Sequence, residues 1–129
     1  MTELPRVAVV EDNPDNRLLL QALLAGRYAV DEYESGPAAL TGITARAPHI
    51  VLLDISLPEM DGAEVLRRLR ADDALRPIPV VALTAHAMSG DRERFLGMGF
   101  DGYVAKPIID ETLLYDAIER LLTRRTEST

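Results

Sequence analysis

Five residues with charged or hydroxyl side chains stand directly after short apolar runs, and their types suit metal and phosphate chemistry. They are Glu11, Asp12, Asp54, Thr84 and Lys106. Three carboxylates held close together cannot all stay ionised unless a cation lies beside them. Lys106 offsets one negative charge, and a divalent metal offsets two more. A small set of carboxylate ligands suits Mg²⁺, which keeps several waters and accepts phosphate oxygens.

The sequence also indicates which carboxylate would react. An Asp carboxylate beside Mg²⁺ can attack phosphorus and form an aspartyl-phosphate. This transfer needs in-line positioning and charge neutralisation, which Mg²⁺, the Lys106 ammonium and the Thr84 hydroxyl would supply. We predict Asp54 as the nucleophile, because it stands alone after a fully apolar run. Taken singly, each acid more often starts a turn or caps a helix, but the coincidence at four strand ends favours a shared function.

The surrounding sequence alternates between short apolar runs and segments of helical period. Strands are predicted at 6–10, 28–33, 50–53, 79–83 and 103–105. Helices are predicted at 14–27, 36–47, 62–71, 90–98 and 111–122, with caps at Asn13, Ser35, Asp61 and Asp110. A strand followed by a helix, repeated along the chain, implies a parallel sheet with helices on both faces.

The strand order 2-1-3-4-5 of a doubly wound five-stranded α/β sheet fits this pattern. The first, third and fourth strands are solidly apolar, as interior parallel strands should be, while Asp31 and Glu32 mark the second as an edge. In such sheets ligands bind beyond the carboxyl ends of the strands, at the switch point between strands 1 and 3. All five reactive residues fall at that end of the sheet.

Length and composition narrow the function classes. The chain has 129 residues, 47% of them apolar, and we assign 1–123 to one domain and 124–129 to a polar tail that frays. It has no cysteine, which excludes thiol nucleophiles and zinc–thiolate sites. A net charge of −7 disfavours nucleic-acid binding. No run predicts a membrane span or a secretory leader, so we expect a cytoplasmic protein.

Four stretches of the chain resemble the motifs of receiver domains from bacterial two-component response regulators. They read VVEDN at 9–13, LDISLPEMDG at 53–62, ALTA at 82–85 and YVAKP at 103–107. The resemblance covers nearly the whole chain and implies the flavodoxin-like receiver fold. The segment 86–99, with Lys106, Pro107 and Ile108 after it, most resembles stand-alone, cell-cycle-type single-domain regulators and the receivers of hybrid kinases.

The resemblance implies a role for each residue of the metal site. Asp54 resembles the phosphoacceptor and Asp12 the direct Mg²⁺ ligand. Glu11 resembles the partner of Asp12, acting at least partly through water. The backbone carbonyl of Ser56 resembles the third protein ligand.

The resemblance also implies a conformational switch. Thr84 and Lys106 resemble the pair that senses the phosphoryl group, Tyr103 resembles an aromatic switch, and the Lys106–Pro107 peptide is expected to be cis. Phosphorylation would draw Thr84 and Lys106 toward the new group and leave space for Tyr103 to turn inward. A pre-existing equilibrium would then shift at the face made by the fourth helix, the fifth strand and the last helix.

These implications predict a single-domain response regulator. Asp54 would take a phosphoryl group from a phosphohistidine on a histidine kinase or phosphotransfer protein that docks near the first helix, including Leu18 and Ala22. The chain would catalyse its own phosphorylation and dephosphorylation rather than turn over a substrate. A downstream protein at the switch face, or onward phosphotransfer, would carry the signal.

Three alternatives stay open. In the first alternative, the chain is a receiver module excised from a hybrid histidine kinase or a multidomain regulator. The second is a Mg²⁺-dependent phosphatase with an Asp nucleophile, but such an enzyme needs another Asp two residues later, where this chain has Ser56. The third, an adaptor with a vestigial site, is disfavoured by the complete set of reactive residues.

The G-x-G-x-x-G run at 97–102 follows a predicted helix and is not a dinucleotide fingerprint.

Overall fold

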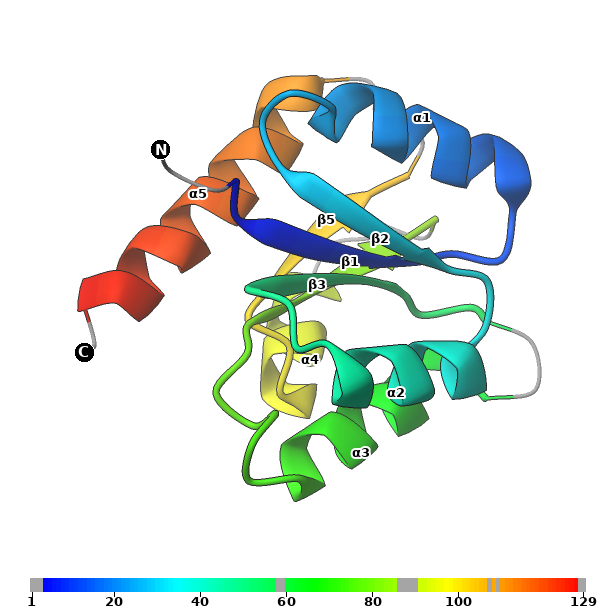
Figure 1. The fold of residues 1–129 in the computed structure, drawn as a ribbon, viewed down its shortest axis with the longest axis vertical. Helices are drawn as coiled ribbons and strands as arrows, with labels where there is room; N and C mark the ends of the chain where they lie inside the picture. The colour runs from blue at the N-terminus through cyan, green and yellow to red at the C-terminus, as the bar shows by residue number, and fades with distance from the viewer. Residues whose placement is uncertain (1–3, 58–59, 86–90, 107, 109, 128–129) are drawn as a thin grey trace.

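The computed structural model describes residues 4–57, 60–85, 91–106, 108 and 110–127, which form alternating strands and helices (Figure 1). The strands are β1 (Arg6–Val10), β2 (Ala29–Tyr33), β3 (Ile50–Asp54), β4 (Val80–Thr84) and β5 (Gly102–Ala105). The helices are α1 (Pro14–Leu24), α2 (Gly36–Ala45), α3 (Gly62–Ala71), α4 (Asp91–Met98) and α5 (Glu111–Glu127).

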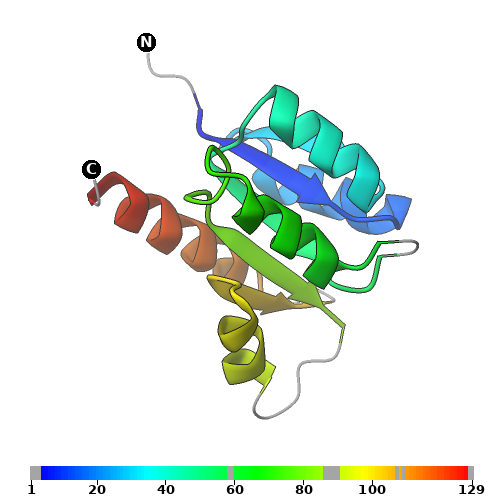
Figure 2. The same cartoon turned by 90° about the horizontal axis from the view of Figure 1, so that it is seen from below.

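The five strands form one parallel sheet in the order β2-β1-β3-β4-β5, as the sequence predicts. Helices α1 and α5 cover one face, while α2, α3 and α4 cover the other (Figures 1 and 2). Because every strand runs the same way, all carboxyl ends meet at one edge of the sheet. Strand β2 lies at the border of the sheet, which agrees with its polar residues.

Side chains of each inner strand alternate between two apolar cores. Along β3, Val51 and Leu53 pack with α2 and α3, while Ile50 and Leu52 pack with α1 and α5. All five β3 residues are buried, because helices cover both faces of a parallel sheet. This burial fixes the register of β3 and, with it, the position of the acid at its end.

Two helix ends differ from the prediction. Helix α1 ends at Leu24 rather than at 27, because Gly26 adopts a φ of 81°, which glycine enters without a Cβ clash. Helix α5 continues to Glu127, so most of the segment predicted as a fraying tail is helical. Residues 111–127 contain no glycine or proline, and the arginines at 124 and 125 are good helix formers.

The G-x-G-x-x-G run begins in the last two residues of α4 and ends at the first residue of β5, so the run follows a helix and leads into a strand. Gly99 follows α4 with a φ of 111°, as expected for a residue that ends a helix. Within the part of the chain that the structure describes, no helix combines the length and apolarity needed to cross a membrane.

One arginine connects two loops at the amino end of the sheet. Arg70 Nη1 donates to the carbonyls of Arg76 and Ile78, at 3.0 and 2.8 Å. Its Nη2 donates to the Gly99 carbonyl at 3.1 Å and to Asp101 at 2.8 Å. Asp101 in turn accepts the Val80 amide at 2.8 Å, so the network fixes the entry of β4.

We expect Arg70→Met to lower the free energy of unfolding by about 2–3 kcal/mol, because it removes several charge-assisted hydrogen bonds. Methionine retains an apolar stem of similar length. Urea denaturation measures the change. Arg67→Met on the same helix is the control: Arg67 pairs with Glu64 at the exposed surface, where solvent screening leaves such a pair little effect on stability. An equal loss in both variants would contradict the network's role.

Candidate functional site

The structure brings the predicted reactive residues to the carboxyl edge of the sheet. Asp54 is the last residue of β3, Thr84 is the last of β4, and Lys106 directly follows β5. Glu11 and Asp12 directly follow β1, which pairs with β3. One carboxylate oxygen from each of the three acids lies within 4.8 Å of the others. The predicted acid cluster is therefore present in the fold.

The acids differ in their exposure to water. Glu11 and Asp54 are 1% and 2% exposed, and Thr84 is fully buried. Asp12 is exposed. The cluster is thus a buried acid pair that opens to solvent through Asp12, which gives a cation a route to the site.

Lys106 bridges the two buried acids. Its Nζ donates to Glu11 Oε2 at 3.0 Å and to Asp54 Oδ2 at 3.1 Å. Its backbone amide donates to the Thr84 carbonyl at 2.7 Å, which places the side chain at the edge of β4. Burial alone would lower the pKa of Lys106, but the hydrogen bonds to Glu11 and Asp54 raise it above its ordinary value. The ammonium therefore stays charged.

Glu11 is held by donors at both carboxylate oxygens. Oε1 accepts the Asn13 amide at 3.2 Å and Asn16 Nδ2 at 3.4 Å, while Lys106 holds Oε2. Burial raises the pKa of Glu11, and the charge of Asp54 adds to this effect, against the lowering by Lys106. Sequence reasoning missed the contact of Asn16 with the site; its position five residues after Glu11, in the first turn of α1, was the available signal.

The loop after β3 orients Asp54. Oδ1 of Asp54 accepts the Ser56 backbone amide at 2.9 Å, so its two oxygens face different donors. The Gly62 amide donates to the Ile55 carbonyl at 3.3 Å, which draws the start of α3 against this loop. The resemblance implied a role for the Ser56 carbonyl as a metal ligand, which stays a prediction. It did not imply the contact of the Ser56 amide with Asp54.

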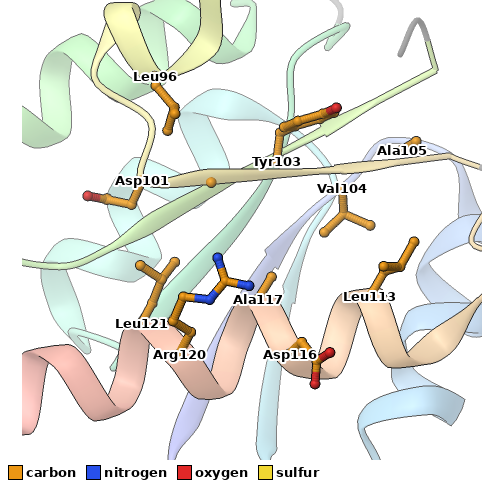
Figure 3. A pocket seen from close by; sticks show the side chains of 11 residues that line it. Leu96, Asp101, Tyr103, Val104, Ala105, Leu113, Asp116, Ala117, Arg120 and Leu121 are labelled. Carbon is orange, nitrogen blue, oxygen red and sulfur yellow. The ribbon is translucent and has the colours of Figure 1, made fainter. Parts of the chain in front are cut away.

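Tyr103 lies on β5, with its ring beside that of Phe95 at 6.0 Å between centroids. Tyr103 and Val104 leave opposite sides of β5, and Val104 points toward α5 (Figure 3). A hollow of about 530 Å³ lies here between α4, β5 and α5. The predicted switch residue is therefore half-buried beside an open groove. The Lys106–Pro107 peptide lies outside the described residues.

The residues at the site fit a magnesium ion by their chemistry. The three clustered side chains that could ligate a metal are carboxylates, and one lysine ammonium contacts two of them, Glu11 and Asp54. The surplus of negative charge favours a hard divalent cation, and oxygen ligands favour Mg²⁺ over softer metals.

The fold and the acid cluster together define a receiver domain. The family model "Response regulator receiver domain" matches residues 7–119, and the chain belongs to this family. The predicted α/β class, strand order and family are thereby confirmed.

The chain is similar to relatives of two kinds. It is 44% identical over 103 residues to the polar-differentiation response regulator DivK of Brucella anthropi, covering 79% of this chain and 84% of DivK. It is 42% identical over 113 residues to the sensor protein GacS of Pseudomonas syringae pv. syringae, covering 84% of this chain. The matched part is 12% of the length of GacS.

Solved structures agree with this assignment. A putative response regulator from Chloroflexus aurantiacus superposes with a TM-score of 0.87 at 25% identity, over 94% of this chain and 99% of that one. The receiver domain of a sensor histidine kinase from Pseudomonas aeruginosa superposes with a TM-score of 0.84 at 33% identity, over 93% and 98%. That structure has a magnesium ion coordinated in its active-site cleft.

Proposed function

We propose that this receiver domain accepts a phosphoryl group on Asp54 from a phosphohistidine donor and requires Mg²⁺ to do so. One observation carries the proposal. The Asp54 carboxylate ends a buried central strand, lies 3.1 Å from the Lys106 ammonium, and has two further carboxylates within 4.8 Å. A carboxylate so placed is a nucleophile with charge neutralisation at hand.

The chain's own residues supply the nucleophile and part of the charge neutralisation. An Asp54 oxygen forms a bond to phosphorus as the bond from phosphorus to the donor imidazole breaks, and the imidazole leaves with the electron pair. Lys106 and the Thr84 hydroxyl face the charge on the phosphoryl oxygens. When bound, Mg²⁺ supplies further positive charge to the same oxygens. The same residues then assist hydrolysis of the acyl-phosphate.

Four residues would hold the metal. Asp12, Asp54 and the Ser56 carbonyl are the direct ligands in this proposal, and Asp12 is the exposed member of the cluster. Glu11 acts through water, because its two oxygens already face donors from Asn13, Asn16 and Lys106. Its carboxylate thus adds charge and positions the lysine.

In this proposal, the conformational change begins when Lys106 exchanges its contacts with Glu11 and Asp54 for contacts with the new phosphoryl group. Thr84 and Lys106 move toward the group, Tyr103 turns inward, and the surface of α4, β5 and α5 changes. The hollow at that surface gives a downstream protein a place to bind.

The donor would dock beside α1, near the opening of the site. Leu18 is 66% exposed and Ala22 is exposed, so both are available to a helical phosphodonor.

A stand-alone cytoplasmic regulator is the form we propose, supported by the similarity to DivK across most of both chains. A receiver module within a larger sensor kinase is the second candidate, supported by the similarity to GacS. The genomic reading frame separates the two.

A small acyl-phosphate donor tests the core of the proposal. Incubation with acetyl phosphate and Mg²⁺ should add one phosphoryl group to the intact mass, in a form that alkali or hydroxylamine releases. Without Mg²⁺ the gain should be absent. A gain that does not depend on Mg²⁺ would contradict the metal requirement, and no gain in either case would refute phosphorylation.

We expect Lys106→Ala to separate phosphorylation from its consequence. Acetyl phosphate should still label Asp54, at a rate lowered by about tenfold, because Mg²⁺ retains most of the charge neutralisation. The NMR shifts that phosphorylation causes in amides of α4, β5 and α5 should be lost. A variant that is phosphorylated and still shows these shifts would exclude Lys106 from the switch.

A further inference from the structure

Arg17, in the first turn of α1, contacts the backbone of both acids that follow β1. Its Nη1 donates to the carbonyl oxygen of Glu11 at 2.9 Å and to that of Asp12 at 3.1 Å. Side chains in a helix lean toward its N-terminus. A long side chain in the first turn of α1 therefore reaches back over the β1–α1 connection.

The same guanidinium is anchored on the edge strand. Nε of Arg17 lies 3.8 Å from Glu32 Oε1, and the Arg17 side chain is only 20% exposed. The amide of Glu11 meanwhile donates to the Tyr33 carbonyl at 3.0 Å. The connection that carries the two acids is thus held by α1 on one side and by β2 on the other.

The two acids depend on this backbone to different degrees. Three donors hold the Glu11 carboxylate directly. Among the described residues, by contrast, no hydrogen bond or ion pair reaches the Asp12 carboxylate, which is exposed. The direction of Asp12 therefore follows from its backbone, and Arg17 holds that backbone.

We propose that Arg17 is a positioning residue of the metal site, which fixes the Asp12 carboxylate for Mg²⁺ by holding the carbonyls of Glu11 and Asp12. This inference rests on the proposed function, because it concerns the same site. A planar guanidinium donates in fixed directions to both carbonyls while it faces Glu32, and an ammonium group cannot reproduce that geometry. Outer-shell partners of metal ligands typically change affinity or activity about 10–100-fold when replaced.

Arg17→Lys tests the inference, because it keeps the positive charge and removes the planar donor. We expect the Mg²⁺ dissociation constant to rise about tenfold. The titration uses Mg²⁺ alone and follows the side-chain NMR signal of Lys106, which is the only lysine of the unsubstituted chain and contacts Glu11 and Asp54. Each arginine-to-lysine variant adds a second lysine signal, which is assigned by comparison with the spectrum of the unsubstituted protein. Arg27→Lys, beyond the far end of α1, is the matched control and should leave the constant unchanged.

Kinetics separate positioning from a general loss of structure. In Arg17→Lys, the half-saturating Mg²⁺ concentration for phosphorylation by acetyl phosphate should rise, while the rate at saturating Mg²⁺ stays near that of the unsubstituted protein. Glu32→Gln loosens the anchor without touching the carbonyl contacts, so a smaller rise is expected, and this variant carries the test if Arg17→Lys does not fold.

An unchanged dissociation constant in the folded variants overturns the role of Arg17. The same holds if Arg17→Lys lowers the saturating rate and leaves the half-saturating concentration unchanged. Failure of the proposed function has a different signature, since the unsubstituted protein itself would then neither bind Mg²⁺ nor take up a phosphoryl group, and both proposals would fall.

Discussion

Asp54→Asn should abolish phosphorylation by acetyl phosphate, with no gain in intact mass at any Mg²⁺ concentration. The amide that replaces the carboxylate has the same shape but is a poor nucleophile and cannot form an acyl-phosphate by this route. One of the two neighbouring hydrogen bonds persists, because the remaining amide oxygen accepts from either the Ser56 amide or Lys106, while the NH2 group cannot accept from the other donor. The loss is therefore chemical rather than a failure to fold.

The control replacement is Asp73→Asn on the loop after α3. The Asp73 side chain is 89% exposed, so its replacement should leave phosphorylation unchanged. Asp54→Asn should also melt within a few degrees of the unsubstituted protein, because it removes a negative charge that faces Glu11. Residual labelling of the Asp54 variant would show that another residue is the nucleophile.

The fold was predictable because local and global signals agree along most of the chain. The fully apolar stretch of β3 requires cover on both faces, and the polar residues of β2 require an edge. These two facts almost determine the strand order, once the chain is seen to alternate strands with helices. The predicted helix caps at Asn13, Ser35 and Asp61 are also confirmed, because each side chain accepts a backbone amide of the first turn.

The clustering of the acids at one edge of the sheet was predictable, but the residues that hold the cluster in place were not. Strand ends place acids, threonine and lysine at one edge by topology alone. The contacts of Arg17 and Asn16 depend on side-chain directions across a loop, and no periodicity reports those directions. The same limit applies to Gly62, whose neighbours in sequence say nothing of how closely α3 approaches the loop after β3. Contacts of this kind are seen only in the folded structure.

Gly62→Ala should damage the site through the backbone. A Cβ at this position would lie 2.6 Å from Ile55 Cα and 2.8 Å from the Asp54 carbonyl oxygen. Neither neighbour is the end of a flexible side chain, so α3 or the loop that carries the phosphoacceptor has to move. We expect a loss of about 1–3 kcal/mol in the free energy of unfolding and phosphorylation slower by about tenfold or more, because small displacements of reacting groups are costly. Urea denaturation and the acetyl phosphate reaction measure the two effects.

Gly97→Ala is the matched control for this replacement. Gly97 lies in α4, and a Cβ there would meet nothing within 4 Å. Alanine favours the helix, so stability should hold or rise by up to about 1 kcal/mol, with no change in phosphorylation. If Gly62→Ala behaved like Gly97→Ala, the loop after β3 would be able to yield without moving Asp54. The close approach of α3 would then be a matter of packing alone, and the orientation of Asp54 would rest on Ser56 and Lys106.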